Sequence, residues 1–238
     1  MSLKTNILAL MLIALSATAQ AREFRSVWKS MPDSVVLAID KVRRLEMLDL
    51  VDYKVKAEVN NRLGSHSVMD TITANYLHIM VTKASELSMR LLPTAEGDTL
   101  VCMVYTYKAP KLESKISFYS LDWQQLDASK YLPFTSIADA ADSLYTKPDS
   151  ISQERYAELR NDVVVALVSA QQSIENDDIC LSLSLPMAAK DNKASMTAIA
   201  DKRKLVWTVK SIYGFRCTSN NKVTHRTIIL KAQWLPVL

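Results

Sequence analysis

The sequence contains very little glycine. Its 238 residues include only Gly64, Gly97 and Gly214, which are widely separated. A phosphate-cradling loop or a dinucleotide-binding fingerprint needs several glycines within a few positions, because the backbone must approach the phosphates closely. The patterns GxSxG and HExxH are absent as well, so a nucleophile elbow and a zincin site are excluded. The chain therefore lacks the short motifs that mark several large enzyme classes.

Cysteine and histidine are also scarce. Three cysteines, Cys102, Cys180 and Cys217, form no CxxC pair, which excludes zinc ribbons and thioredoxin-type redox sites. An odd number permits at most one disulfide, and the sequence does not show whether any two of them are bridged. Cys102 and Cys180 sit in strand-like runs, where a buried cysteine behaves as a small hydrophobic residue. We expect no metal site and no cofactor, and no catalytic residue can be named.

No strong charge of either sign is present. Lysine and arginine total 29 against 25 acidic residues, a formal charge of +4. Nucleic acid and anionic membranes require basic residues clustered on one face. The densest basic spot, Lys202-Arg203-Lys204, is typical of a solvated helix end or turn. We therefore expect no nucleic-acid partner.

The N-terminus has the pattern of a secretory signal peptide. Lys4 precedes an apolar run at 7–15, and small residues follow up to Ala21. A membrane anchor would need about 20 apolar residues, which is roughly twice this run. We expect cleavage after Ala21, in preference to Ala19, and a mature chain that is periplasmic or secreted. No later stretch is apolar enough to span a bilayer, so no membrane span is expected in the mature chain.

Alternating apolar residues at 76–107 predict an antiparallel meander. Leu77, Ile79 and Val81 share one face of the first run, since successive strand side chains point to opposite sides. We expect that face to continue through Leu87, Met89 and Leu91 and then through Leu100, Cys102 and Val104. Further strands at 67–74 and 115–123 give a sheet of four or five strands. One helical layer against one sheet face would complete this unit.

Helical spacing precedes the meander. Pro32 and Asp33 suit a first helical turn. Val35, Ile39 and Val42 follow at helical intervals, and we expect a break at 41–44 before a second helix that ends at Gly64.

The order of elements predicted for the second half repeats that of the first. A connector at 126–150, with a short helical piece at 136–145, leads to a helix at 151–161. Strands are expected at 164–172 and 179–185, a helix at 188–202 and a strand at 205–211. A helical stripe over 156–170 is the alternative at the first strand, but the triplet Val163-Val164-Val165 favours a strand. Trp207 would then occupy the place of Trp123.

The expected fold is α+β, with antiparallel sheets packed against helices. Two related helix-plus-meander units are one hypothesis for its organisation. We predict a signal peptide at 1–21, a first unit at 22–130 and a related α+β unit at 131–214. Residues 215–238, with an apolar run at 227–230, form a tail or an edge strand. Internal duplication is a hypothesis that rests on element order.

Several segments resemble a known family. FRSVWKSMPDSVVLAI at 24–39, RLEMLDLVDYKVKAEVNNRLG at 44–64 and KPDSISQERYAEL at 147–159 resemble the domain of unknown function 3256 family, up to about Ser211. These are exported proteins of Bacteroides-type bacteria. The resemblance supports export, but the family has no established activity, so it assigns no role to any residue.

Candidate polar sites all have ordinary explanations. His78 is expected on the solvent side of its strand, His66 in a turn, and His225 is far from both in the sequence. Two acidic pairs have i, i+3 spacing and could share acid–base work or a calcium ion, but solvated helices show such spacing often. The polar run 175–178 is better explained as a hairpin turn than as a calcium loop. The acidic pairs are Asp49 with Asp52 and Asp139 with Asp142.

Five aromatic residues in or near the meander could expose a binding face, although packing within the sheet is the more ordinary role. They are Tyr105, Tyr107, Phe118, Tyr119 and Trp123.

The sequence does not identify a function. The leading hypothesis is an exported, non-enzymatic module that binds a protein, a peptide or an envelope component through a sheet face or edge. The alternative is a hydrolase-type enzyme whose site is assembled from distant residues, for example a histidine and Asp49 or Asp52 in one pocket. A purely structural envelope scaffold is a third possibility.

Overall fold

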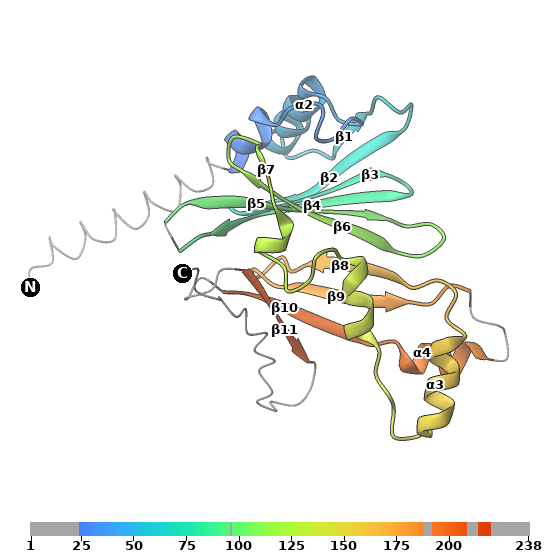
Figure 1. Cartoon of the computed structure of the whole chain (residues 1–238). Coiled ribbons are helices and arrows are strands. Elements are labelled where there is room, and N and C mark those ends of the chain that lie inside the picture. The colour runs from blue at the N-terminus through green and yellow to red at the C-terminus, as the bar shows by residue number, and fades with distance from the viewer. Residues whose placement is uncertain (1–23, 96, 188–191, 209–213, 220–238) are drawn as a thin grey trace, which may run out of the picture.

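The structure, a computed structural model, describes residues 24–95, 97–187, 192–208 and 214–219, the last range by its backbone alone. Three layers lie on top of one another (Figure 1). A helical layer from the N-terminal part covers one face of a seven-stranded sheet, and a four-stranded sheet lies against the other face. The predicted α+β fold with antiparallel sheets is confirmed. The proposed signal peptide, His225 and the run at 227–230 lie outside the described residues.

The large sheet is a simple meander. Its strands follow one another in chain order, and each pairs with the next in antiparallel fashion. The predicted meander at 76–107 is confirmed as β3, β4 and β5. The strands are β1 (Ala57–Asn60), β2 (His66–Ile72), β3 (Tyr76–Thr82), β4 (Ser85–Pro93), β5 (Thr99–Tyr107), β6 (Glu113–Ser120) and β7 (Gln125–Leu126).

The central strands β4 and β5 of the large sheet are buried on both faces, which corrects the predicted pattern of faces. Leu87 pairs with Tyr105 and Met89 with Met103, so the odd-numbered positions of β5 join the face that meets the helical layer. Leu100, Cys102 and Val104 point the other way, into the core beneath the small sheet. The run in β5 is apolar at consecutive positions, as in strands covered on both sides. Alternation alone could not choose between its two faces.

The helical layer differs from the prediction. Residues 24–30 are helical, 33–39 form turns, and α2 (Lys41–Asp52) begins where a break was expected. The Asp40 side chain caps α2 by accepting the Arg43 N–H at 3.1 Å, and this backbone bond lowers the pKa of Asp40. The predicted second helix is present as α2, but its predicted extent up to Gly64 is wrong, because α2 ends at Asp52 and β1 begins at Ala57.

A buried arginine explains why 33–39 is not helical. The Arg44 side chain is 1% exposed and donates to the carbonyl oxygens of Met31 and Ile39, the latter at 2.8 Å. It also pairs with the Asp33 carboxylate at 2.9 Å. These carbonyls lie at the two ends of the turn segment, so the guanidinium holds that segment in an irregular shape against α2.

The small sheet has the strand order β11-β10-β9-β8. Its strands are β8 (Leu167–Gln172), β9 (Ile179–Ser184), β10 (Lys202–Thr208) and β11 (Gly214–Ser219), and the remaining helices are η1 (Ala128–Lys130), η2 (Ala138–Leu144), α3 (Gln153–Asn161) and α4 (Lys193–Ile199). The strand interpretation is confirmed for 167–172, whereas 163–166 has no regular structure.

Two details of the second half differ from the prediction. The basic run Lys202-Arg203-Lys204 begins β10 and is neither a helix end nor a turn. Of the helix expected at 188–202, residues 193–199 form α4, and 188–191 lie outside the described part. Residues 214–219 form an edge strand on β10.

The two tryptophans do not occupy equivalent places. Trp123 lies in the turn after β6, with a φ of 62°, and its Nε1 donates to the Val27 carbonyl at 3.1 Å in the helical-layer core. Trp207 lies within β10, and its Nε1 donates to the Pro93 carbonyl at 2.9 Å between the two sheets. The division at 22–130, 131–214 and 215–238 stays a prediction, as does internal duplication.

Among the residues that the structure describes, no helix combines the length and the apolar character needed to cross a bilayer.

The carbonyl contacts of Arg44 lead to a stability prediction. Replacing Arg44→Met keeps an apolar stem but leaves the Met31 and Ile39 carbonyls without these donors. We expect a loss of about 3 kcal/mol in the free energy of unfolding, measured in urea by circular dichroism. The matched variant Arg62→Met removes an exposed guanidinium and should change this free energy by less than about 0.5 kcal/mol. Equal losses in both variants would contradict the anchoring role of Arg44.

Candidate functional site

The small sheet covers only part of the large sheet. Strand β8 lies across β4, β5 and β6, and the same face of β2 and β3 continues beyond it. A hollow of about 210 Å³, named here the β8 crevice, opens where this cover ends. Its walls include Asp70, Tyr76, His78, Glu86, Gln172 and Ile174. The crevice is therefore built from strands that are far apart in the sequence.

A row of charged and polar side chains crosses the floor of the crevice, one from each neighbouring strand. Nδ1 of His78 lies 2.8 Å from each carboxylate oxygen of Asp70. Nε2 of His78 lies 3.9 Å from Oε2 of Glu86, which accepts from Lys108 at 2.6 Å. A bulge between Met69 and Thr71 brings Asp70 beside His78. His78 is on the predicted face, but it lines a hollow and its side chain is 23% exposed.

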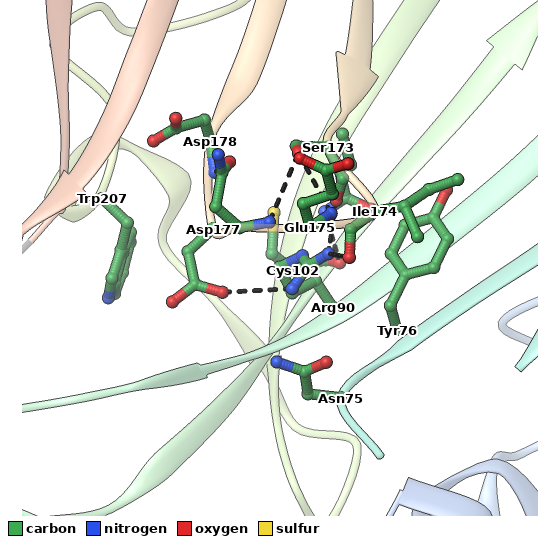
Figure 2. A network of polar contacts seen from close by, with 12 residues as sticks. Asn75, Tyr76, Arg90, Cys102, Ser173, Ile174, Glu175, Asp177, Asp178 and Trp207 are labelled. Carbon is green, nitrogen blue, oxygen red and sulfur yellow. Dashed lines mark hydrogen bonds and ion pairs between the residues drawn. The ribbon is translucent and has the colours of Figure 1, made fainter. Parts of the chain in front are cut away.

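A second buried arginine closes one end of this region. Arg90, on β4, is 2% exposed and donates to the Ile174 carbonyl at 2.9 Å and to the Ser173 carbonyl. It pairs with Asp177 at 3.2 Å. Its guanidinium also lies over the Tyr76 ring, 5.0 Å from the centroid, so that it sits between Asp177 and Tyr76 (Figure 2). Arg90 thereby fixes the connection between β8 and β9 to the large sheet.

That connection is the polar hairpin turn predicted at 175–178, which is confirmed. The Ser173 hydroxyl accepts the Glu175 N–H at 3.2 Å, and the Ser173 N–H donates to the Asp178 carbonyl at 2.9 Å. Asp177 pairs with Arg90, and Asp178 pairs with Lys204. The two carboxylates are thus engaged by different basic residues. Within the described ranges, no three His, Cys, Asp or Glu side chains are placed to hold a metal ion.

Gln172 lines both the crevice and a second hollow of about 450 Å³, whose walls include the hairpin. Its Nε2 donates to the Cys102 carbonyl at 3.1 Å, whereas its buried Oε1 has no partner among the described residues. Burial raises the pKa of the Cys102 thiol far above its usual range. Cys102 and Cys180 are both free thiols, and the side chain of Cys217 lies outside the described part.

The predicted acidic pairs do not form a site. Asp52 pairs with Arg25 at 2.8 Å, and a hydrogen bond from Arg25 lowers the pKa of Asp52. Asp49 is exposed on the same helix. Both belong to the helical layer and do not line the β8 crevice.

The other pair is likewise engaged separately. Asp139 accepts the Ser136 N–H at 2.8 Å, and Asp142 pairs with Arg160 at 2.9 Å. His66 starts β2 instead of lying in a turn, and its Nδ1 is 3.6 Å from Glu58.

The five meander aromatics do not form one exposed face. Phe118 is buried beneath the small sheet, whereas Tyr119 and Trp123 pack together toward the helical layer with ring centroids 5.5 Å apart. Tyr105 also packs on that layer and lies 5.0 Å from Tyr107, the exposed member of the five. The predicted packing role is confirmed for the other four.

The role of Arg90 can be tested by removing its donors. In Arg90→Met, two hairpin carbonyls and Asp177 lose these contacts, so we expect a loss of about 3 kcal/mol in the free energy of unfolding. The amide hydrogens of Ser173 and Asp178 should also exchange faster with solvent. Arg155→Met is the matched control, since it removes a half-exposed ion pair with Glu158 and one hydrogen bond to the Asn192 side chain, and it should cost about 1 kcal/mol. If the hairpin amide hydrogens of Arg90→Met exchange at the wild-type rate, Arg90 does not fix the β8–β9 connection to the large sheet.

Comparison with other proteins identifies the family but no activity. The family described as "Protein of unknown function (DUF3256)" matches residues 16–213, close to the limit expected from the sequence. A domain of an uncharacterized protein from Porphyromonas gingivalis W83 has a similar fold, with a TM-score of 0.66 at 20% identity. That similarity covers 82% of this chain and 99% of the other. No curated protein matches. The chain belongs to the DUF3256 family of proteins of unknown function.

Proposed function

We propose that this protein is exported and binds a protein partner through the β8 crevice, without chemical turnover. The observation that carries this proposal is a polar hollow on the part of the large sheet that the small sheet leaves open. Pockets for whole small-molecule ligands usually enclose about 300–1,000 Å³. At about 210 Å³ the crevice suits one side chain of a larger partner better than a complete cofactor.

Binding at a sheet face has more support than strand addition at a sheet edge. Within the described part of the chain, the two sheets have four edge strands, and a side chain engages one backbone group on each of two of these edges. On β1, Arg43 donates to the Asn60 carbonyl, and on β8 the Ala170 N–H donates to the Ser114 hydroxyl at 2.9 Å. A peptide strand needs such backbone groups unpaired. Binding at the open face of the large sheet beside β8 does not need unpaired backbone groups.

The proposed location rests on the N-terminal sequence and on the resemblance to exported proteins. A positive residue, a short apolar run and small residues before Ala21 are typical of a cleaved signal. The periplasm and the cell exterior both agree with this pattern.

Site-specific crosslinking tests the proposed surface. A photoreactive amino acid at Gln171, which is exposed at the crevice, should capture a defined protein in intact cells of the native organism. The same amino acid at Lys56, exposed beside the helical layer, should not capture that protein. Mass spectrometry of the crosslinked products identifies it. Capture of the same proteins from both positions, or from Lys56 alone, would refute binding at the crevice.

A hydrolase-type enzyme is the second candidate, because the crevice does unite a histidine with carboxylates. These are Asp70 and Glu86 instead of the predicted Asp49 or Asp52. Ser88 lies opposite His78 in the register of β3 and β4 and lines the same hollow. The Ser88 hydroxyl, however, is hydrogen-bonded to Tyr76, and His78 Nε2 faces Glu86. The arrangement therefore lacks a hydrogen bond between a nucleophilic Ser88 hydroxyl and His78 as its general base.

Kinetics separate the two candidates. With chromogenic esters, phosphate esters and fluorogenic peptides, we expect the same rate for the wild type and for His78→Ala. His66→Ala is the matched control, since His66 is exposed outside the crevice. General acid–base catalysis contributes a factor of about 100 or more. A loss of that size in His78→Ala alone would replace the binding proposal with the enzyme.

A further inference from the structure

We propose that one end of the large sheet docks on a lipid bilayer whose headgroups are anionic. This end consists of the turns at 61–65, 83–84 and 108–112, named here the basic rim. None of these residues lines the β8 crevice, so docking at the rim does not depend on a partner in the crevice. The charge of the rim, its exposed apolar side chains and the opposite charge at the far end of the sheet support this role.

The meander brings the three turns of the basic rim together. Antiparallel strands that follow one another reverse direction at each turn, so every second turn lies at the same end of the sheet (Figure 1). Two hydrogen bonds link these turns. Asn61 Nδ2 donates to the Val81 carbonyl, beside the second turn, at 2.9 Å, and the Lys108 N–H donates to the Ala84 carbonyl at 2.9 Å. The rim is therefore one connected surface.

Each turn of the basic rim carries an exposed positive charge. Arg62, Lys83 and Lys111 supply one each, and the three turns contain no acidic residue. Among the described residues, Lys83 and Lys111 form no ion pair. Their charges are therefore available to an anionic surface, which attracts each nearby lysine or arginine.

Acidic residues next to the turns do not cancel this charge. Glu86 pairs with Lys108, the remaining basic residue of the third turn, at 2.6 Å. Glu113 is exposed at the start of β6, and exposed Lys115 lies two positions further on the same face of the strand. Each of these acidic residues has a basic neighbour, so the charge of one basic residue in each turn stays in excess.

The opposite end of the large sheet has the opposite charge. Its turns at 73–75, 94–98 and 121–124 contain no lysine or arginine, and Asp98 and Asp122 are exposed there. A charge separation along the strands orients a protein in the field of a charged surface. Near an anionic bilayer, the basic rim would therefore face the lipid and the acidic end would face away.

Exposed apolar side chains favour a bilayer over other anionic partners. Leu63 and Leu112 are 65% and 44% exposed, and each lies next to the exposed basic residue of its turn. Tyr107, which is 53% exposed, precedes the third turn. Apolar side chains of this kind enter the boundary between headgroups and acyl chains, while lysine stems extend to the headgroups. Single-stranded nucleic acid would instead need aromatic side chains on which successive bases stack.

Cosedimentation of the full-length mature protein with vesicles tests this inference. The probes are vesicles of phosphatidylcholine alone and vesicles of equal parts phosphatidylcholine and phosphatidylglycerol. We expect the protein to bind the mixed vesicles only. Raising the salt concentration from about 0.1 M to about 1 M shortens the Debye length from roughly 10 Å to roughly 3 Å, so most of the bound protein should be released.

Charge variants locate the contact. Lys83→Gln and Lys111→Gln should each weaken binding to the mixed vesicles about fivefold, the contribution of one basic residue near an anionic surface. Lys54→Gln makes the same change at the opposite end of the sheet, before the start of β1, and should have no effect.

Apolar variants test insertion into the bilayer. Leu63→Ser and Leu112→Ser should each weaken binding about tenfold, because a hydroxymethyl group gains little from leaving water. Val55→Ser, at the opposite end of the sheet, is the matched control and should bind like the wild type. All of these side chains are exposed, so the variants should keep the wild-type unfolding midpoint in urea.

Several results would overturn docking on an anionic bilayer. These are equal binding to both kinds of vesicle, no binding to either, and a loss in Lys54→Gln as large as the loss in Lys83→Gln. Polyglutamate that binds as tightly as the mixed vesicles, together with unchanged binding of both leucine variants, would replace the bilayer with an acidic protein. Crosslinking at Gln171 tests the crevice separately, so either surface can fail without the other.

Discussion

The contacts of the buried Arg90 guanidinium fix the position of the small sheet on the large sheet. Apolar side chains bring the two sheets together, but hydrophobic contact has no direction and does not fix how one sheet lies on the other. Arg90 adds direction, because it donates to two hairpin carbonyls and pairs with Asp177 from a fixed place on β4. The position of β8 over the large sheet, and with it the edge of the crevice, follows from these contacts.

The helical layer is held to its own neighbour by the same physical means. Arg44 is as deeply buried as Arg90, lies over an aromatic ring and donates to carbonyls of an irregular segment. A guanidinium has five donors in a rigid plane, so it can satisfy several backbone groups that no helix or strand pairs. In both cases one long side chain from a regular element replaces the hydrogen bonds that the loop cannot make itself.

The sequence predicted the strands well where polar and apolar residues alternate, as in β3 and β9. It failed where the pattern has two solutions. β5 is apolar on both faces, so its facing depended on pairing with β4, which is a property of the folded sheet. Residues 33–39 have helical spacing, but the Arg44 side chain donates hydrogen bonds to the Met31 and Ile39 carbonyls at the two ends of this segment. The crevice was not predictable either, since the bulge at Asp70 and the position of the hairpin depend on tertiary contacts. A single arginine inside the apolar run of β4 was the available signal.

The contacts of Arg90 also affect the entropic cost of binding in the crevice. Strand β8 is paired to β9 along its length, and the adjoining hairpin is pinned to β4. The wall of the hollow is therefore preorganised. A partner side chain that enters gives up its own rotational freedom, but the described residues that line the hollow are already held in place before it arrives. Selection then depends on how well the arriving group matches the fixed walls of the hollow, as in rigid sites that gain affinity by avoiding the entropic cost of closing.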